Sequence, residues 1–158
     1  MLDIKPNNIL VDYEEQPSEK AIVIKDVKVS DLEDAVKLKP DTAIEGAALG
    51  NKLWRSPESW TGAMQGHPSD VFSIGVVAIY AMLNRMVFYS GLTDEQLNGD
   101  DAWWHILRRH ISIFGTDTES LRGLVRHVCG DGDGPWLERF ADLAESSGDQ
   151  EPRRPFAG

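Results

Sequence analysis

The sequence has few features of a secreted or membrane protein. Its single cysteine, Cys129, excludes an intrachain disulfide, and no Asn-x-Ser/Thr glycosylation sequon occurs. The N-terminus lacks the basic-then-apolar order of a signal peptide. The longest apolar stretch, Val71–Leu83, is shorter than the roughly 20 residues that a membrane-spanning helix needs. We therefore expect an intracellular, cytoplasmic protein that has no membrane partner.

Basic clusters are also scarce. The pairs Arg108–Arg109 and Arg153–Arg154 are too short to replace the counterions of a phosphate backbone, so we expect no nucleic-acid partner. The 158 residues instead carry a net charge of −10. This acidic excess has two possible explanations: it keeps the protein soluble, or it favours basic partners and basic peptide substrates.

The first part of the chain is expected to form a small β-ribbon. β-branched residues favour short strands at Ile9–Val11, Ala21–Ile24 and Val27–Val29, and a polar segment at Glu14–Lys20 reads as a loop. Proline and two glycines, without a steady apolar period, predict a long loop at Leu38–Asn51.

After Pro57 we expect four or five helices around a central one. The central helix runs from Asp70 to about Leu83 with Ser69 as its N-cap, and it is apolar on nearly every side, which favours the middle of a core. An amphipathic helix is expected at Asp101–Phe114, and apolar stripes at 121–128 and 136–144 indicate two more. A length of 158 residues suits one domain.

The densest group of polar side chains stands at the start of the chain, in the pattern Asp3-x-Lys5-x-x-Asn8. A carboxylate can accept a hydroxyl proton, a lysine can neutralise a transferring phosphate, and an amide can coordinate Mg²⁺. Phosphoryl transfer depends mainly on positioning and charge neutralisation, so this set is suited to it. The alternative is a polar loop with a helix cap.

A second acidic group, Asp31-Leu32-Glu33-Asp34, follows the last expected strand. Carboxylates at a strand end, beside an asparagine from another loop, would give a site of hard oxygen ligands for Mg²⁺. The alternative is a solvated acidic turn. Ser56-Pro57-Glu58, Asp70 and the run Glu151–Pro155 follow, and the order of these groups carries more weight than any one of them.

In this order the motifs resemble those of the eukaryotic protein kinase family. The run Asp3–Val11 is similar to the catalytic loop, which implies Asp3 as catalytic base, Lys5 as the catalytic lysine that contacts phosphate, and Asn8 as a metal ligand. A lysine two positions after the aspartate is typical of serine/threonine kinases. Asp31 stands in the place of the main Mg²⁺ ligand. The resemblance therefore implies ATP and Mg²⁺ as cofactors and a protein serine or threonine as substrate.

The later motifs resemble the rest of a kinase domain. Gly50–Glu58 is similar to the end of the activation segment, and Ser69–Gly75 is similar to the start of the central buried helix. The resemblance implies an ion pair between Arg154 and Glu58. Residues with implied structural roles are Asn51, Ser56, Pro57, Glu58, Asp70 and Arg154.

The resemblance implies the C-terminal lobe of a protein kinase over residues 1–158, from the catalytic loop to the late arginine segment. The fold class is then mainly α with a small β-ribbon, within the α+β kinase fold. The glycine-rich loop and the strand lysine that grip ATP do not occur in the sequence. We therefore expect the N-terminal lobe to be missing, to be needed as a partner, and to leave the isolated chain inactive.

Two departures from the family pattern keep a second hypothesis open. Leu2 stands where an arginine usually precedes the catalytic aspartate, and Glu33 replaces a glycine beside the expected metal site. The first hypothesis is a serine/threonine kinase, and the second is a pseudokinase-like binding module that holds a partner without transferring phosphate. The runs Trp54–Glu58 and Ser69–Ser73 also resemble kinase-like proteins of filamentous fungi.

Overall fold

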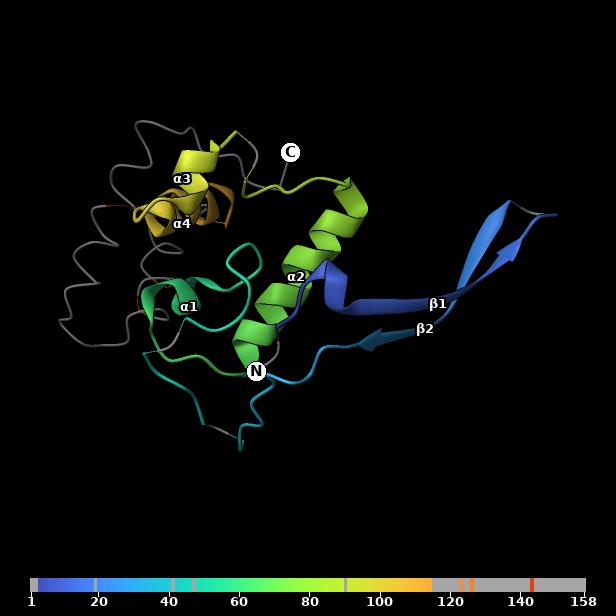
Figure 1. Cartoon of the computed structure of the whole chain (residues 1–158), viewed down its shortest axis with the longest axis horizontal. Coiled ribbons are helices and arrows are strands. Elements are labelled where there is room, and N and C mark those ends of the chain that lie inside the picture. Colours follow the sequence, from blue (N-terminus) through green and yellow to red (C-terminus); the bar gives the residue numbers. More distant parts are fainter. Residues whose placement is uncertain are drawn as a thin grey trace.

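The structure, a computed structural model, describes residues 3–114 and three later residues. The gaps in this range are Glu19, Asp41, Ala47 and Ser90, and the later residues are Gly123, Arg126 and Leu143. In the described part a hairpin precedes the helices and projects away from them (Figure 1). The elements are η1 (Pro6–Asn8), β1 (Ile9–Gln16), β2 (Ala21–Val29), α1 (Pro57–Thr61), α2 (His67–Leu83), α3 (Asp94–Asn98) and α4 (Ala102–Phe114).

β1 and β2 form one antiparallel hairpin that is longer than the sequence suggested. It pairs Ile9 with Val29 at its base and Gln16 with Ala21 at its tip, with a register shift after Asp12. The segment from 14 to 16 was expected in a loop but belongs to β1. Cross-strand pairing explains this extension, since Glu14, Glu15 and Gln16 lie opposite Val23, Ile22 and Ala21, and a diagonal salt bridge joins Lys25 Nζ to Glu14 Oε2 at 2.8 Å.

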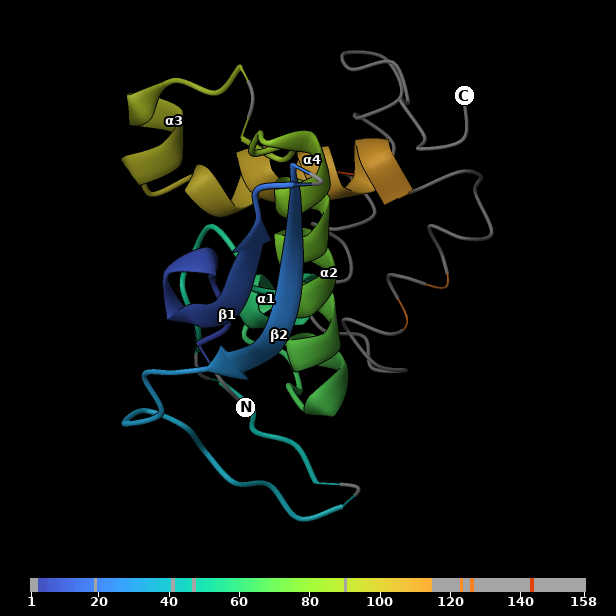
Figure 2. The ribbon, with the colours of Figure 1, turned by 90° about the vertical axis from the view of Figure 1, so that its right-hand side faces the viewer.

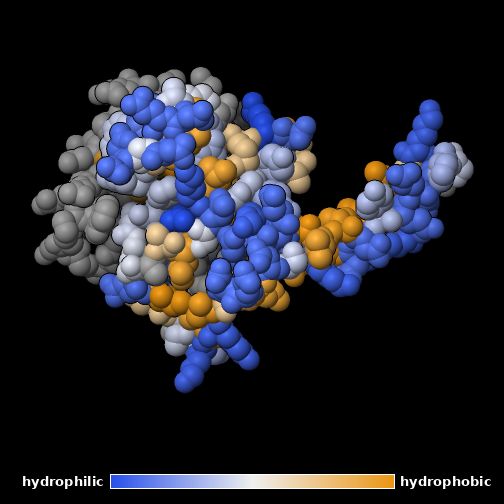
Figure 3. Space-filling view, in the orientation of Figure 1, coloured by the Kyte–Doolittle hydropathy of each residue, from blue (hydrophilic) through white to orange (hydrophobic). Residues whose placement is uncertain are grey.

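One face of the hairpin is apolar because successive cross-strand pairs place apolar side chains on the same side. Val11 lies opposite Val27, and Tyr13 lies opposite Ile24 on the same face. Ile22 and Ile24 are 65% and 61% exposed, so this face is open to solvent in the described part of the chain. Apolar surface gathers on the projecting hairpin near its base (Figure 3).

The expected fold class, a C-terminal kinase lobe whose N-terminal lobe is missing, is wrong. The described chain opens with a two-stranded antiparallel hairpin and continues into helices, an order consistent with the start of an N-terminal lobe. The strands are longer than the sequence predicts, because polar residues at 14–16 suggest a strand end. Pairing across the hairpin keeps these residues extended.

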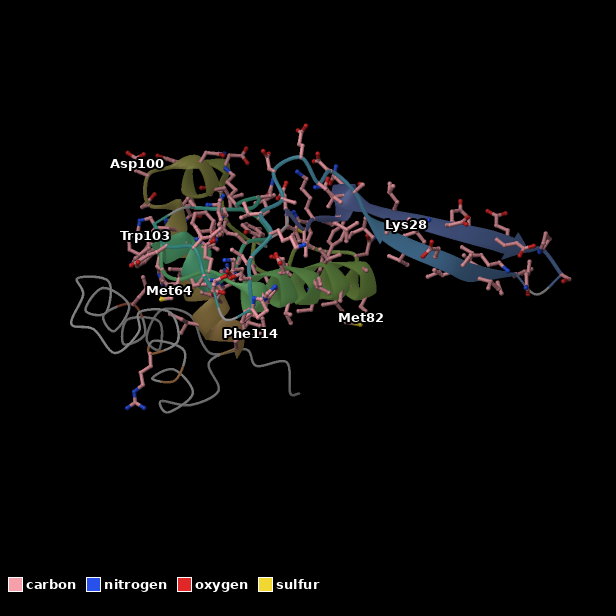
Figure 4. The ribbon with its side chains drawn as sticks, turned by 90° about the horizontal axis from the view of Figure 1, so that it is seen from below. Lys28, Met64, Met82, Asp100, Trp103 and Phe114 are labelled. Carbon is pink, nitrogen blue, oxygen red and sulfur yellow. The ribbon has the colours of Figure 1, made fainter. Side chains whose placement is uncertain are left out.

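α2 differs from the expected central helix in its start and in its burial. It begins at His67 rather than Asp70, and Pro68 fits its first turn, where a backbone N–H would have no helical partner. Val71 and Met82 are 66% and 75% exposed. Met82 lies on the outer side of the helix near its C-terminal end (Figure 4). Among the described residues, α2 is therefore covered on one side and is not surrounded by the core.

The core lies where α4 crosses α2. The two helices run roughly crosswise (Figure 2), and α4 contributes the fully buried Ile106, Leu107 and Ile111. Trp54 packs edge-on against Tyr80 of α2, with ring centroids 5.5 Å apart. The sequence placed this helix at Asp101–Phe114, which is confirmed to within one residue because its apolar stripe is the side that is buried.

The loop at 38–51 agrees with the sequence-based prediction, whereas the two later helices are not tested. The segment from 38 to 51 is irregular, as expected, apart from a single bridge between Ile44 and Gln65. The expected helices at 121–128 and 136–144 lie almost wholly outside the described residues. No helix in the described part is long and apolar enough to cross a bilayer.

Candidate functional site

The first turn of the chain is closed by hydrogen bonds that the sequence Asp3–Asn8 makes to itself. Pro6 favours the 3₁₀ turn that begins there, since its ring fixes φ near the helical value. The backbone N–H of Asn8 donates to the Lys5 carbonyl at 2.9 Å, and its side-chain Nδ2 donates to the Asp3 carbonyl at 2.8 Å. Asn8 is 4% exposed, so the loop is wrapped around its amide.

The Asp3 carboxylate is held on both sides. Its Oδ2 accepts a hydrogen bond from Lys5 Nζ at 2.5 Å, and its Oδ1 accepts one from the backbone N–H of Asn51 at 2.7 Å. The hydrogen bond to Asp3 raises the pKa of Lys5; burial opposes this, and the charges of Asp3 and Asp31 add smaller contributions that raise it. The carboxylate and the ammonium therefore form a charged pair at this site.

Asp31 is brought to the same place through its neighbour Ser30. Both the backbone N–H and the hydroxyl of Ser30 donate to the Asn8 carbonyl, at 2.8 and 3.1 Å. Asp31 has a φ of +60°, a left-handed conformation that is uncommon for a residue with a Cβ. The structure thus gathers four of the sequence-derived site residues, and the acidic residues Glu33 and Asp34 stay exposed beside them.

A metal ion at this site would need oxygen ligands from the Asn8 amide and from a bound phosphate as well as from carboxylates. In the described part of the chain, no group of three or more His, Cys, Asp or Glu side chains is arranged to hold a metal ion. The Asn8 amide oxygen and the exposed Asp31 carboxylate are hard oxygen donors of the kind that Mg²⁺ prefers, and Mg²⁺ usually takes only one or two protein ligands with phosphates. The residues present therefore fit Mg²⁺ bound together with a phosphate.

The Ser56-Pro57-Glu58 motif begins α1 and lies next to the start of α2. Ser56 is the N-cap residue and Pro57 the first helical residue, and both are buried. The Glu58 carboxylate is 5% exposed and accepts a hydrogen bond from the hydroxyl of Ser69 at 2.6 Å. Asp70 lies in the first turn of α2. Arg154 is outside the described residues, so its ion pair with Glu58 stays a prediction.

The segment 51–55 is fixed by contacts that the sequence did not reveal. The Tyr89 hydroxyl donates to the Lys52 carbonyl at 2.8 Å, and Lys52 Nζ donates to the Leu97 carbonyl at the end of α3 at 3.1 Å. Burial raises the pKa of Tyr89. Sequence reasoning assigned no role to Tyr89 and Lys52, because their partners are distant along the chain. It also assigned none to Arg55, which lies within the Gly50–Glu58 run and donates to the Gly50 carbonyl.

The chain is similar to known protein kinases. The family model described as the protein kinase domain matches residues 1–129. The serine/threonine-protein kinase PrkC of Bacillus subtilis is 30% identical over 87 residues, which are 54% of this chain and 12% of that protein. No solved structure matches the chain. The family match begins at the first residue and does not correspond to a C-terminal lobe alone, so the expected missing lobe is not supported.

Proposed function

The chain belongs to the protein kinase family, and we propose that its Asp3–Asn8 loop is the phosphoryl-transfer site of a serine/threonine protein kinase that uses ATP and Mg²⁺. The observation that carries the proposal is the convergence of Asp3, Lys5, Asn8 and Asp31 from two sides of the hairpin. The match to a serine/threonine kinase supports the substrate class, a protein hydroxyl.

Asp3 is assigned the role of proton acceptor in the transfer, and Lys5 that of neutralising charge. The Asp3 carboxylate would accept the proton of the substrate hydroxyl, a role that contributes roughly 10²–10⁴-fold to a rate. Lys5, whose raised pKa keeps it charged, would neutralise the transferred phosphoryl group. The two side chains are in contact, so the charge that would meet the phosphoryl group lies beside the carboxylate that would accept the proton.

Asn8 and Asp31 are assigned to the metal. Mg²⁺ supplies charge neutralisation on the nucleotide phosphates when bound. The Asn8 Nδ2 group is occupied by the Asp3 carbonyl, which orients the amide and leaves its oxygen as the donor toward a cation. The left-handed conformation of Asp31 supports this assignment, because backbone strain of this kind clusters at functional sites.

The test separates binding from transfer. Binding of a fluorescent ATP analogue and transfer of radiolabelled phosphate to a protein substrate are measured for the purified protein and its variants. Asp31→Asn should weaken the Mg²⁺-dependent part of nucleotide binding. Asp3→Asn should keep nucleotide binding and lower transfer by about 10²–10⁴-fold. Asp34→Asn is the matched control, since Asp34 is an exposed acid near Asp31.

Two outcomes would contradict the proposal. Phosphate transfer that persists undiminished in Asp3→Asn would show that Asp3 is not the base. A protein that binds a partner and transfers no phosphate would favour the alternative function, a pseudokinase-like binding module. The exposed Glu33 beside Asp31 is the observation that favours this alternative, because it adds a negative charge next to the metal ligands.

A further inference from the structure

The peptide group between Gly50 and Asn51 is hydrogen-bonded at both of its ends. Its oxygen, the Gly50 carbonyl, accepts a hydrogen bond from the Arg55 guanidinium at 2.5 Å. Its N–H, on Asn51, donates to the Asp3 carboxylate at 2.7 Å. A peptide unit is planar and trans, so its C=O and N–H point in opposite directions and turn together. Whatever holds the oxygen therefore also aims the N–H.

Gly50 is suited to this position. Its φ of +76° lies in the left-handed region, which a glycine adopts without steric cost. A Cβ placed on Gly50 would lie 4.0 Å from the Arg55 Cβ and 4.0 Å from Asp3 Oδ1. The glycine therefore lies close to both the arginine and the carboxylate.

Arg55 is itself held in place. Its guanidinium lies 5.0 Å from the centroid of the Trp60 ring, within cation–π range. Burial lowers the pKa of Arg55, while Tyr89 and Asp3 oppose that effect. Arginine remains charged in proteins, so its bond to the Gly50 carbonyl is charge-assisted. A charged donor on the oxygen also polarises the peptide and strengthens the N–H as a donor.

We propose that Arg55 is a positioning residue for phosphoryl transfer: it fixes the Gly50–Asn51 peptide and thereby the orientation of the Asp3 carboxylate. This inference rests on the proposed function of Asp3. Asp3 is otherwise oriented by Lys5, which must be able to leave it for a phosphate. The contact through Asn51 is then the one that keeps the carboxylate aimed while Lys5 moves.

The first experiment tests whether Arg55 fixes the Gly50–Asn51 peptide, without any assay of activity. The amide resonance of Asn51 is followed by ¹H–¹⁵N NMR in the native protein and in Arg55→Met, which keeps the aliphatic stem and removes the charge. The Asn51 amide proton should move upfield and exchange faster with solvent in Arg55→Met. Arg85→Met is the control, since Arg85 is an exposed arginine after α2. An unchanged chemical shift and exchange rate of the Asn51 amide in Arg55→Met would show that Arg55 does not fix this peptide.

The second experiment measures its effect on transfer. Arg55→Met should lower kcat on the order of 10–100-fold, the cost of misplacing a catalytic group, with KM for ATP little changed. Arg55→Lys, which restores the charge, should recover part of kcat. In an Asp3→Asn background, Arg55→Met should lower kcat hardly further, since the two act as one unit.

The outcomes separate this inference from the proposed function. If the native protein transfers no phosphate, the proposed function fails, and the NMR result still decides whether Arg55 sets the Asn51 amide. If transfer occurs but Arg55→Met and Asp3→Asn have independent, multiplicative effects on kcat, positioning through Asp3 is refuted. A lower apparent kcat with an unfolded NMR spectrum would be a folding defect, and the kcat of Arg55→Lys is then compared with that of the native protein.

Discussion

His110 makes the fold sensitive to acid. It lies on α4 and is 2% exposed, among the aromatic side chains of the core. Its ring packs edge-on against Phe88 and Phe72, with centroids 4.5 and 5.3 Å apart. Phe114, at the end of the same helix, is seen beside α2 in Figure 4. Burial lowers the pKa of His110 from 6.5 to about 3. A charged imidazole there would lose its hydration and gain no compensating partner from these rings.

The magnitude follows from the two pKa values. The folded-state pKa is below the unfolded one, so the unfolded chain binds the proton first as the pH falls. The contribution of neutral His110 to the free energy of unfolding is fully present above pH 6.5 and is lost progressively as the pH drops toward 3. Each pH unit below 6.5 costs about 1.4 kcal/mol, which gives about 2 kcal/mol at pH 5. That is a large part of the total stability of a small domain.

Urea denaturation at several pH values between 7.5 and 5 measures this effect. His110→Leu removes the titrating group, although it also changes packing. The useful quantity is therefore the difference in unfolding free energy between native and variant protein. This difference should shift by about 2 kcal/mol in favour of the variant as the pH falls to 5. His67→Gln is the control, because His67 is exposed. An equal loss of stability in native protein and His110→Leu would refute the reasoning.

Three further predictions follow from other parts of the molecule. Arg154→Ala should lower the unfolding free energy by about 3–5 kcal/mol, because it strands the buried Glu58 carboxylate, and an unchanged urea curve would exclude their ion pair. Ile22→Lys and Ile24→Lys should reduce binding of a hydrophobic dye, since both side chains are exposed on the apolar hairpin face; equal dye fluorescence would show that another surface binds it. Thr42 is the only hydroxyl residue between Asp31 and Ser56 and so the candidate for phosphorylation in that loop; any kinase activity should nevertheless survive phosphatase treatment and Thr42→Ala, since a leucine precedes Asp3 where an arginine would bind a loop phosphate, and a large loss of activity in either case would contradict this.

The local parts of the site could be predicted from the sequence because they depend on neighbours in the chain. The loop from Asp3 to Asn8 closes through its own proline turn and its own asparagine, as a polar loop of that spacing can. The helix from 102 to 114 was predicted because one strong apolar stripe decides both its period and its buried side.

The parts that failed depend on contacts between distant residues. Ser69 has the chemistry of an N-cap, yet its hydroxyl donates to Glu58 and the helix begins before it. The sequence does not reveal that Asn51 contacts Asp3 through its backbone N–H. Its side-chain oxygen accepts a hydrogen bond from the Leu53 N–H. An apolar helix such as α2 shows no period that tells which of its sides the rest of the chain will cover.

The geometry of the site is held mainly by backbone groups. The Asn8 carbonyl receives both donors of Ser30, and the Asp3 carboxylate receives the N–H of Asn51, so three segments of the chain meet through contacts that tolerate many side chains. Glu33 is exposed and takes part in none of these contacts. The exposed charges around Asp31 therefore decide between a kinase and a binding module, and Mg²⁺-dependent nucleotide binding in Glu33→Gly and in the native protein measures their effect.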